Sequence, residues 1–284
     1  MGFLSFEWDG RQTYGVRQDE GSYLEAPAAF REQFPDLKSV IAAGQLAGLK
    51  AAALAQGAVV PAGQARLLPV IPNPGKIFCV GLNYKSHVAE MKRPDADHPA
   101  IFVRFADSLA AADAALQRPA FSDRFDYEGE LAIVIGKGGR HISQADAFDH
   151  VAGYACFNDG TVRDWQRHTH QWTPGKNFPV TGAFGPCLVP ADEVGDVNAL
   201  TLQTRLNGQI VQQASLADLI FTIPVIVEYL SRFTPLAAGD VIATGTPGGV
   251  GDKRNPPLYM KDGDLVEVEI TGLGILRNTV AQAA

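Results

Sequence analysis

Two acidic residues separated by one glycine, Glu128 and Glu130, are the first feature of this sequence that could do chemistry. They begin an apolar run within the stretch Asp126–Gly136, which is predicted to be a strand. Because side chains alternate faces along a strand, both carboxylates would point to one side. Two carboxylates this close repel each other unless a cation lies between them. An oxygen-only site favours a hard divalent ion such as Mg²⁺ or Mn²⁺.

Asp159 is the candidate for a third ligand. It follows a second apolar run, Val151–Phe157, and comes directly after Asn158. An aspartate in this position is more often a turn former or a helix cap. Its pairing with Glu128 and Glu130 is what makes it a ligand candidate.

A histidine and a glutamate three residues apart, His87 and Glu90, lie in a charged segment that is compatible with a helix. On a helix they would be neighbours on one face and could form a pair. The alternative is a solvated surface pair, which is common at this spacing. The polar stretch Met91–Pro99 that follows is interpreted as a loop suited to a lid.

Further polar side chains could hold an anionic substrate. Arg163 and Gln166 supply a cation and an amide, although they could equally begin an ordinary polar helix. Lys176 lies in the stretch Thr173–Pro186, which is rich in proline and glycine and is predicted to be irregular. Long irregular loops in compact domains often carry function, and a surface lysine is the alternative.

A glycine-rich stretch, Thr244–Gly251, follows a short apolar run near the C-terminus. Its glycines would allow several backbone N–H groups to point at one anion. It lacks the Gly-Lys-Ser/Thr ending of a phosphate-binding loop and fits no dinucleotide fingerprint, so a carboxylate is the expected guest. The alternative interpretation is a glycine-rich turn at the end of a strand.

The elements that must position these residues are mostly short strands. This pattern predicts an α+β fold that is predominantly β, and not a doubly wound sheet. Asn207-Gly208 between two apolar runs predicts a hairpin, which is interpreted as scaffold. Residues 1–70 are expected to form a small N-terminal module with a hairpin and an Ala-rich helix, whose signals run over Leu37–Gln56 and are interrupted by Gly44 and Gly48. Residues 71–284 are expected to form the main domain. Another helix is predicted over Ser143–Asp149.

Composition excludes several classes of function. The chain has 284 residues, 46% of them hydrophobic, and a net charge of −7 without a basic run, which argues against nucleic-acid binding. No apolar stretch approaches the length of a membrane span. Its three cysteines, with no Cys-x-x-Cys spacing, suit a reducing compartment. Since no secretory signal is evident, we expect a cytoplasmic protein.

Six motifs taken together resemble the fumarylacetoacetate hydrolase superfamily from about Lys76 onward. They are Gly-Leu-Asn-Tyr-Lys-Ser-His-Val-Ala-Glu at 81–90, Asp-Tyr-Glu-Gly-Glu-Leu-Ala at 126–132, Asn-Asp at 158–159, Arg-Asp-Trp-Gln at 163–166, Gly-Lys-Asn-Phe at 175–178 and Thr-Gly-Thr-Pro-Gly-Gly-Val-Gly at 244–251. The resemblance implies a mixed β-roll, usually a homodimer. It also implies one Mg²⁺ or Mn²⁺ per subunit, held by Glu128, Glu130 and Asp159.

The resemblance also implies roles for the other residues. Lys176 would place positive charge near a developing enolate, and His87 backed by Glu90 would take a proton from an attacking water. The substrate-binding groups would be Arg163, Gln166 and Thr246, the last donating to a substrate carboxylate through its hydroxyl and backbone N–H.

The leading hypothesis is a metal-dependent hydrolase that cleaves a carbon–carbon bond in acylpyruvate-type 2,4-diketo acids, as in catabolism of aromatic compounds or sugar acids. One alternative within enzymes is an oxaloacetate-type decarboxylase or a keto–enol tautomerase, which needs the same enolate but no attack by water. An alternative of another class is a metal-stabilised protein that binds a small acid without turnover.

Overall fold

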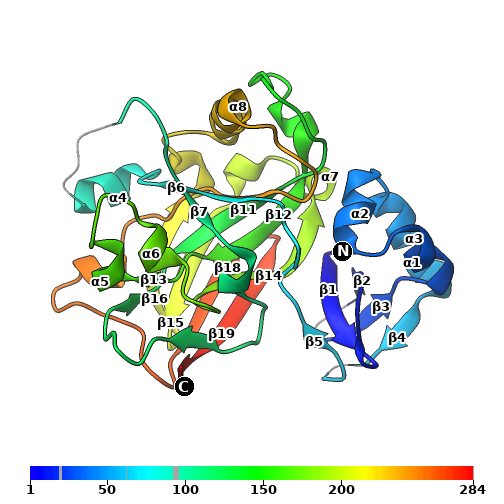
Figure 1. Ribbon diagram of the computed structural model, residues 1–284, viewed down its shortest axis with the longest axis horizontal. Coiled ribbons are helices and arrows are strands. Elements are labelled where there is room, and N and C mark those ends of the chain that lie inside the picture. The colour runs from blue at the N-terminus through cyan, green and yellow to red at the C-terminus, as the bar shows by residue number, and fades with distance from the viewer. Residues whose placement is uncertain (19–20, 62, 92–95, 284) are drawn as a thin grey trace.

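The computed structural model describes residues 1–18, 21–61, 63–91 and 96–283, and strands dominate it (Figure 1). A large sheet runs in the order β4 (Ala58–Val60), β3 (Tyr23–Glu25), β2 (Arg11–Arg17), β1 (Phe3–Trp8), β14 (Gly182–Pro190), β12 (Val151–Asn158), β11 (Gly129–Ile135), β17 (Val241–Ala243), β6 (Ile77–Gly81) and β7 (Ala100–Arg104). β5 (Arg66–Leu67) pairs with β1, and β8 (Leu109–Ala110) with β14.

A second sheet has the order β16 (Gln209–Ser215), β15 (Thr201–Leu206), β18 (Leu265–Ile270), β19 (Gly274–Gln282) and β9 (Leu116–Arg118). β10 (Phe125–Asp126) and β13 (Thr161–Val162) form a two-stranded ribbon. The predicted α+β, predominantly β fold is therefore confirmed.

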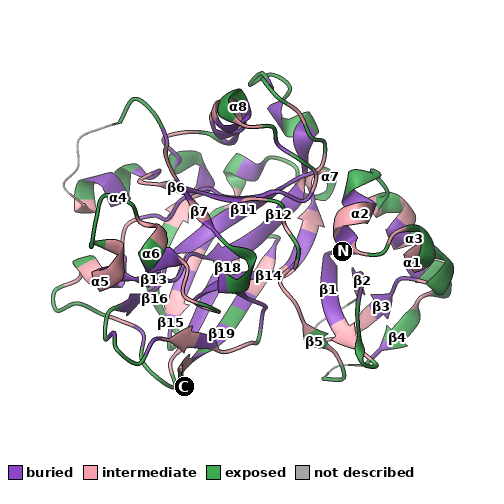
Figure 2. Ribbon diagram, in the orientation of Figure 1, coloured by how far each residue is buried: buried purple, intermediate pink, exposed green. Residues whose placement is uncertain are grey.

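β11 lies at the centre of the molecule and is buried along its whole length (Figure 2). Leu131, Ile133 and Ile135 belong to the core shared with the second sheet. Ala132 and Val134 belong to the core on the opposite face, which the N-terminal module helps to cover. Burial on both faces explains why this segment reads as a continuous apolar run instead of an alternating one.

The helices are short: α1 (Ala28–Gln33), α2 (Leu37–Ala42), α3 (Leu46–Gln56), α4 (Lys85–Glu90), α5 (Arg163–Gln166), α6 (Thr173–Lys176), α7 (Ala191–Val194) and α8 (Ile223–Phe233). α8 buries Ile223, Ile226, Val227 and Leu230, the i, i+3, i+4, i+7 stripe of a helix packed on a core. None of the helices in the described ranges has the length and apolar character needed to span a bilayer.

The N-terminal module contains the predicted hairpin, β1 and β2, turning at Asp9-Gly10. The helix predicted over 37–56 is divided at the first of its two predicted interruptions, Gly44, while Gly48 lies within a helix. The chain forms α2 and α3, because it turns at Gly44, whose φ of 65° is unfavourable for other residues. β1 also pairs with β14 through Phe3 and Leu188, so the module extends the large sheet. The boundary predicted near residue 70 stays a prediction.

Two predictions about local structure are wrong. The strand predicted over 126–136 is broken, because Glu128 N–H donates to the Asn158 side chain (3.0 Å) and not to a neighbouring strand. The helix predicted over 143–149 is replaced by a turn, in which Ser143 Oγ bonds the Asp146 side chain (2.7 Å), and a short 3₁₀ helix at Ala147–His150.

The stretch Thr173–Pro186 is more regular than predicted. Pro174 occupies the first turn of α6, where a missing N–H costs nothing, and β14 begins at Gly182. Gly182 is required there, because an added Cβ would lie 2.6 Å from the Arg104 guanidinium.

Candidate active site

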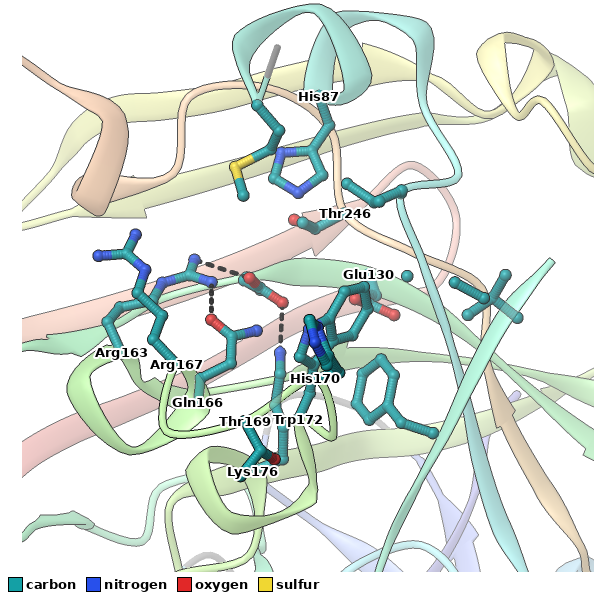
Figure 3. A pocket seen from close by; sticks show the side chains of 17 residues that line it. His87, Glu130, Arg163, Gln166, Arg167, Thr169, His170, Trp172, Lys176 and Thr246 are labelled. Carbon is teal, nitrogen blue, oxygen red and sulfur yellow. Dashed lines mark hydrogen bonds and ion pairs between the residues drawn. The ribbon is translucent and has the colours of Figure 1, made fainter. Parts of the chain in front are cut away.

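A cavity of about 350 Å³ opens where α4, the α5–α6 segment and the N-terminal end of β11 meet (Figure 3). Seven of the nine predicted site residues line it: His87, Glu128, Glu130, Arg163, Gln166, Lys176 and Thr246. The other two, Glu90 and Asp159, contact lining residues from behind. The structure thus brings together residues from five separated parts of the chain.

Glu128, Glu130 and Asp159 converge as predicted, each offering one oxygen within 4.8 Å of the others. The antiparallel pairing of β11 with β12 places Gly129 opposite Asn158. A hydrogen bond from Asp159 N–H to the Glu128 carbonyl (2.8 Å) closes the gap beyond the strand ends. All three residues are buried, so water screens their mutual repulsion little.

A network of buried ion pairs surrounds these carboxylates. Arg163 Nη2 lies 2.7 Å from Glu128 Oε1. Lys176 Nζ lies 2.6 Å from both Glu128 Oε2 and Asp159 Oδ2. Burial alone would raise the pKa of Glu128, but the charges of Lys176 and Arg163 lower it to about 2. Burial alone would lower the pKa of Lys176. The negative charges of Asp159 and Glu128 outweigh this effect and raise the pKa, so Lys176 is an ammonium.

Two members of this network were missed by the sequence analysis as site residues. Arg104 Nη1 pairs with Asp159 Oδ1 at 2.7 Å, and Arg163 Nε pairs with Asp126 Oδ2 at the same distance. Asp126 also accepts the backbone N–H groups of Gly251 (2.8 Å) and Asp252 (2.9 Å). In the sequence Arg104 is a single arginine at the end of an apolar run, and it lacked the pairing with Glu128 and Glu130 that made Asp159 a candidate.

Glu130 is the one carboxylate of the cluster without an ion-pair partner among the described residues. The ion-paired groups balance, three carboxylates against three cations: Asp126, Glu128, Asp159, Arg104, Arg163 and Lys176. Within the described part of the chain, Glu130 accepts one hydrogen bond, from the Gly245 N–H at 2.8 Å. Burial and the neighbouring Asp159 and Glu128 raise its pKa well above the ordinary value. An oxygen-only cluster with one uncompensated carboxylate fits a divalent cation such as Mg²⁺ or Mn²⁺.

The predicted pair of His87 and Glu90 is present on α4, with His87 Nδ1 3.3 Å from Glu90 Oε2. His87 is only 5% exposed, so the pair is not a solvated surface pair. The other oxygen of Glu90 accepts the Gly249 N–H at 3.1 Å. Figure 3 shows the His87 ring pointing from α4 into the cavity, toward Thr246 and Arg163.

The glycine-rich loop receives carboxylates of the protein itself, which differs from the predicted capture of a substrate carboxylate. The N–H groups of Gly245, Gly249 and Gly251 donate to Glu130, Glu90 and Asp126, respectively. The Thr246 hydroxyl donates to the Gly129 carbonyl (3.0 Å), so its hydrogen is not free for a substrate. Of the two donors predicted for a substrate carboxylate at Thr246, the hydroxyl and the backbone N–H, the backbone N–H alone stays a prediction.

The remaining wall of the cavity comes from residues that carried no clear sequence signal, among them Phe102, His170 and Trp172. The Gln166 side chain lies in the cavity and accepts a hydrogen bond from Arg163 Nη1 at 3.0 Å. Met91 lines the cavity beside α4. Part of the predicted lid, residues 92–95, lies outside the described residues.

The amino-acid sequence of the chain matches those of known proteins. The sequence profile described as fumarylacetoacetate (FAA) hydrolase, C-terminal, matches residues 76–281. The chain is 40% identical over 228 residues to the mitochondrial oxaloacetate tautomerase FAHD2A of Homo sapiens, covering 80% of this chain and 73% of that protein.

Solved structures of related proteins match the chain over its full length. A fumarylacetoacetate hydrolase from Exiguobacterium antarcticum superposes with a TM-score of 0.87 at 35% identity, covering 100% of both chains. A maleylpyruvate hydrolase from Sphingobium sp. SYK-6, solved with manganese(II) and pyruvate, superposes with a TM-score of 0.83 at 29% identity, again over 100% of both chains.

Proposed function

Because this chain belongs to the fumarylacetoacetate hydrolase family, we propose that it interconverts the keto and enol forms of an oxaloacetate-type 2-oxo acid with the help of a divalent metal. The observation that carries the proposal is a single oriented base, His87, facing the acidic cluster. Both oxygens of its partner Glu90 are engaged, by His87 and by Gly249, which fixes the orientation of the imidazole. The similarity to an oxaloacetate tautomerase supports the same function.

The residues that would hold the metal are Glu128, Glu130 and Asp159, one ion per chain. When bound, Mg²⁺ or Mn²⁺ supplies a Lewis acid that stabilises negative charge on the 2-oxo oxygen. Lys176, an ammonium fixed between Glu128 and Asp159, adds fixed positive charge to the same part of the cavity. Arg163 and Gln166 line the adjoining wall and would orient a substrate carboxylate.

His87 moves the proton. With Nδ1–H donating to Glu90, the Nε2 lone pair is free to accept a proton from C3 of the substrate. The C3–H electron pair becomes the C2=C3 double bond, and the carbonyl pair moves to the 2-oxo oxygen. That oxygen takes up a proton from solvent to give the enol, and the imidazolium returns its proton to solvent. The reverse sequence converts enol to keto, with no net change in protons.

The test is a rapid-mixing assay of enol oxaloacetate decay, followed by its ultraviolet absorbance, with Mg²⁺ or Mn²⁺ and with chelator. We expect the metal-loaded protein to accelerate the decay without releasing pyruvate or carbon dioxide. Decay at the uncatalysed rate, with or without metal, would refute the proposal. Metal-dependent oxalate binding with no turnover of any 2-oxo acid would favour a binding protein instead.

Hydrolysis of an acylpyruvate-type 2,4-diketo acid is the second candidate function. It is favoured by the similarity to a maleylpyruvate hydrolase whose structure contains manganese(II) and pyruvate. The same His87–Glu90 pair would then take a proton from water, which attacks the distal ketone and expels the pyruvate unit. Release of pyruvate and a second acid from acylpyruvates, faster than any tautomerisation, would select this candidate.

A further inference from the structure

Gln212, a buried residue of β16, contacts two separate parts of the site. It is 2% exposed and lies in the hairpin that the sequence analysis interpreted as scaffold. Its Oε1 accepts the Gly129 N–H at 3.0 Å. Its Nε2 donates to the Thr246 hydroxyl at 2.8 Å and to the Pro247 carbonyl at 2.9 Å. Its acceptor and both donors are thus engaged, which fixes the side chain in one orientation.

On one side, Gln212 holds the strand end that presents the carboxylates. Gly129 separates Glu128 from Glu130, and its N–H donates to Gln212. Its carbonyl accepts from the Thr246 hydroxyl, which in turn accepts from Gln212. This closed ring of three hydrogen bonds ties the Gly129 backbone to the glycine-rich loop through a side chain from the second sheet.

On the other side, the loop held by Gln212 holds α4. Directly after Pro247, Gly248 N–H donates to Ser86 Oγ (3.1 Å) and Gly249 N–H donates to Glu90 Oε1 (3.1 Å). Glu90 in turn orients His87. Hydrogen bonds and the backbone of residues 247–249 therefore connect Gly129, at the acidic cluster, with His87 on α4. Gln212 and the Thr246 hydroxyl both link Gly129 to the loop, and Gln212 also orients that hydroxyl.

We propose that Gln212 is a positioning residue that fixes the location of the His87 imidazole relative to the Glu128, Glu130 and Asp159 cluster. The inference rests on the proposed role of His87 as the proton-transfer base. Proton transfer is sensitive to placement, since a displacement of about 1 Å costs on the order of a hundredfold in rate. Metal binding depends on the carboxylates, and two of the three, Glu128 and Asp159, are also held by buried cations that do not contact Gln212.

The first experiment compares Gln212→Met with Gln213→Met as a matched control. Methionine keeps the length of the side chain but removes both donors and the strong acceptor. Gln213 is the next residue of the same strand and is exposed, so its replacement tests the substitution alone. For Gln212→Met we expect kcat for tautomerisation to fall by about tenfold to a hundredfold. KM and the Mn²⁺ dissociation constant should stay within about threefold, and Gln213→Met should match wild type.

A second measurement does not depend on turnover. The imidazole NMR signals of His87, assigned by their loss in His87→Asn, should shift in Gln212→Met and stay in place in Gln213→Met. If the wild-type protein turned over no 2-oxo acid, the proposed function would fail, yet these signals would still decide whether Gln212 positions His87.

Gln212→Glu covers the case in which Gln212→Met does not fold. It keeps the acceptor for Gly129 N–H and the side-chain volume but loses the donors to Thr246 and Pro247. A positioning role predicts lowered kcat and shifted His87 signals in this variant too. Unchanged His87 signals with unchanged kcat, or a loss of Mn²⁺ affinity that accounts for the whole loss of activity, would overturn the proposal.

Discussion

At the scale of single residues, the site divides into groups that hold a metal and groups that move a proton. Glu128 belongs to the acidic cluster and to its ion-pair network. Among the described residues, His87 forms a side-chain pair with Glu90 and none with a member of that network. The two kinds of residue should therefore fail in different ways when they are replaced.

We predict that Glu128→Ala loses both metal binding and activity, because it removes a ligand and takes from Lys176 and Arg163 one of the two carboxylates with which each is paired. His87→Asn should keep the metal and lower kcat by about a hundredfold to ten-thousandfold. Calorimetric titration with Mn²⁺ beside the kinetic assay checks both variants. Equal loss of metal in the two would contradict this division of roles.

Glu130 makes metal binding depend on pH. Its pKa is raised in the folded protein, so between the unfolded value and the raised value the native state binds more protons than the unfolded state. The free energy of unfolding of the metal-free protein should therefore fall as pH rises through this window, by the contribution of Glu130. The metal needs the deprotonated carboxylate, so metal affinity should rise with pH and binding should release a proton.

Titrations of Mg²⁺ or Mn²⁺ in two buffers of different ionisation enthalpy measure this proton. Glu130→Gln serves as the control, since it has no proton to release. Equal observed enthalpies in the two buffers for the wild-type protein, after correction for its other groups, would be incompatible with the raised pKa.

At the scale of elements, the glycine-rich loop and the β15–β16 hairpin must approach each other closely to carry the site. A Cβ added at Gly249 would lie 2.2 Å from the Val211 carbonyl, and the φ of 103° is itself unfavourable for other residues. At Gly129 an added Cβ would lie 2.1 Å from Thr204 Oγ1. These glycines are needed for contact with the second sheet, not for an open anion site.

Gly249→Ala tests the importance of this close approach. Gly263→Ala is the matched control, because Gly263 also has a positive φ (85°) but no atom within 4 Å of an added Cβ. The control should cost about 1–2 kcal/mol of unfolding free energy from backbone strain alone. Gly249→Ala should cost more and should lower activity through Glu90, as measured by denaturant unfolding and by kcat. Equal costs would mean that the loop can move away from Val211 freely.

At the scale of the whole molecule, sequence alone predicted the fold class and the convergence of the main site residues. Glu128 and Glu130 were found because two carboxylates on one strand face call for a cation, and Asp159 was found because it could complete their ligand set. Arg104 and Gln212 were not, because a lone polar residue in a strand looks the same whether it faces solvent or a site. The broken strand at Glu128 could not be predicted either, since it depends on the Asn158 side chain from a distant segment.

Assembly of the molecule stays a prediction. We expect a homodimer, whose mass by light scattering would be twice 30.4 kDa, at concentrations used for kinetics. A mass of 30.4 kDa under the same conditions would show that the described cavity functions within a single chain.

The central claim is that His87 transfers a proton at C3 of a 2-oxo acid beside a metal held by the acidic cluster. Exchange of the C3 hydrogens of oxaloacetate with D₂O, followed by proton NMR, measures this step without depending on any product. The account predicts exchange that the metal-loaded protein accelerates, that chelator abolishes and that His87→Asn lowers by at least about a hundredfold. Exchange in the His87→Asn variant at the wild-type rate, or no acceleration by the wild-type protein, would contradict it.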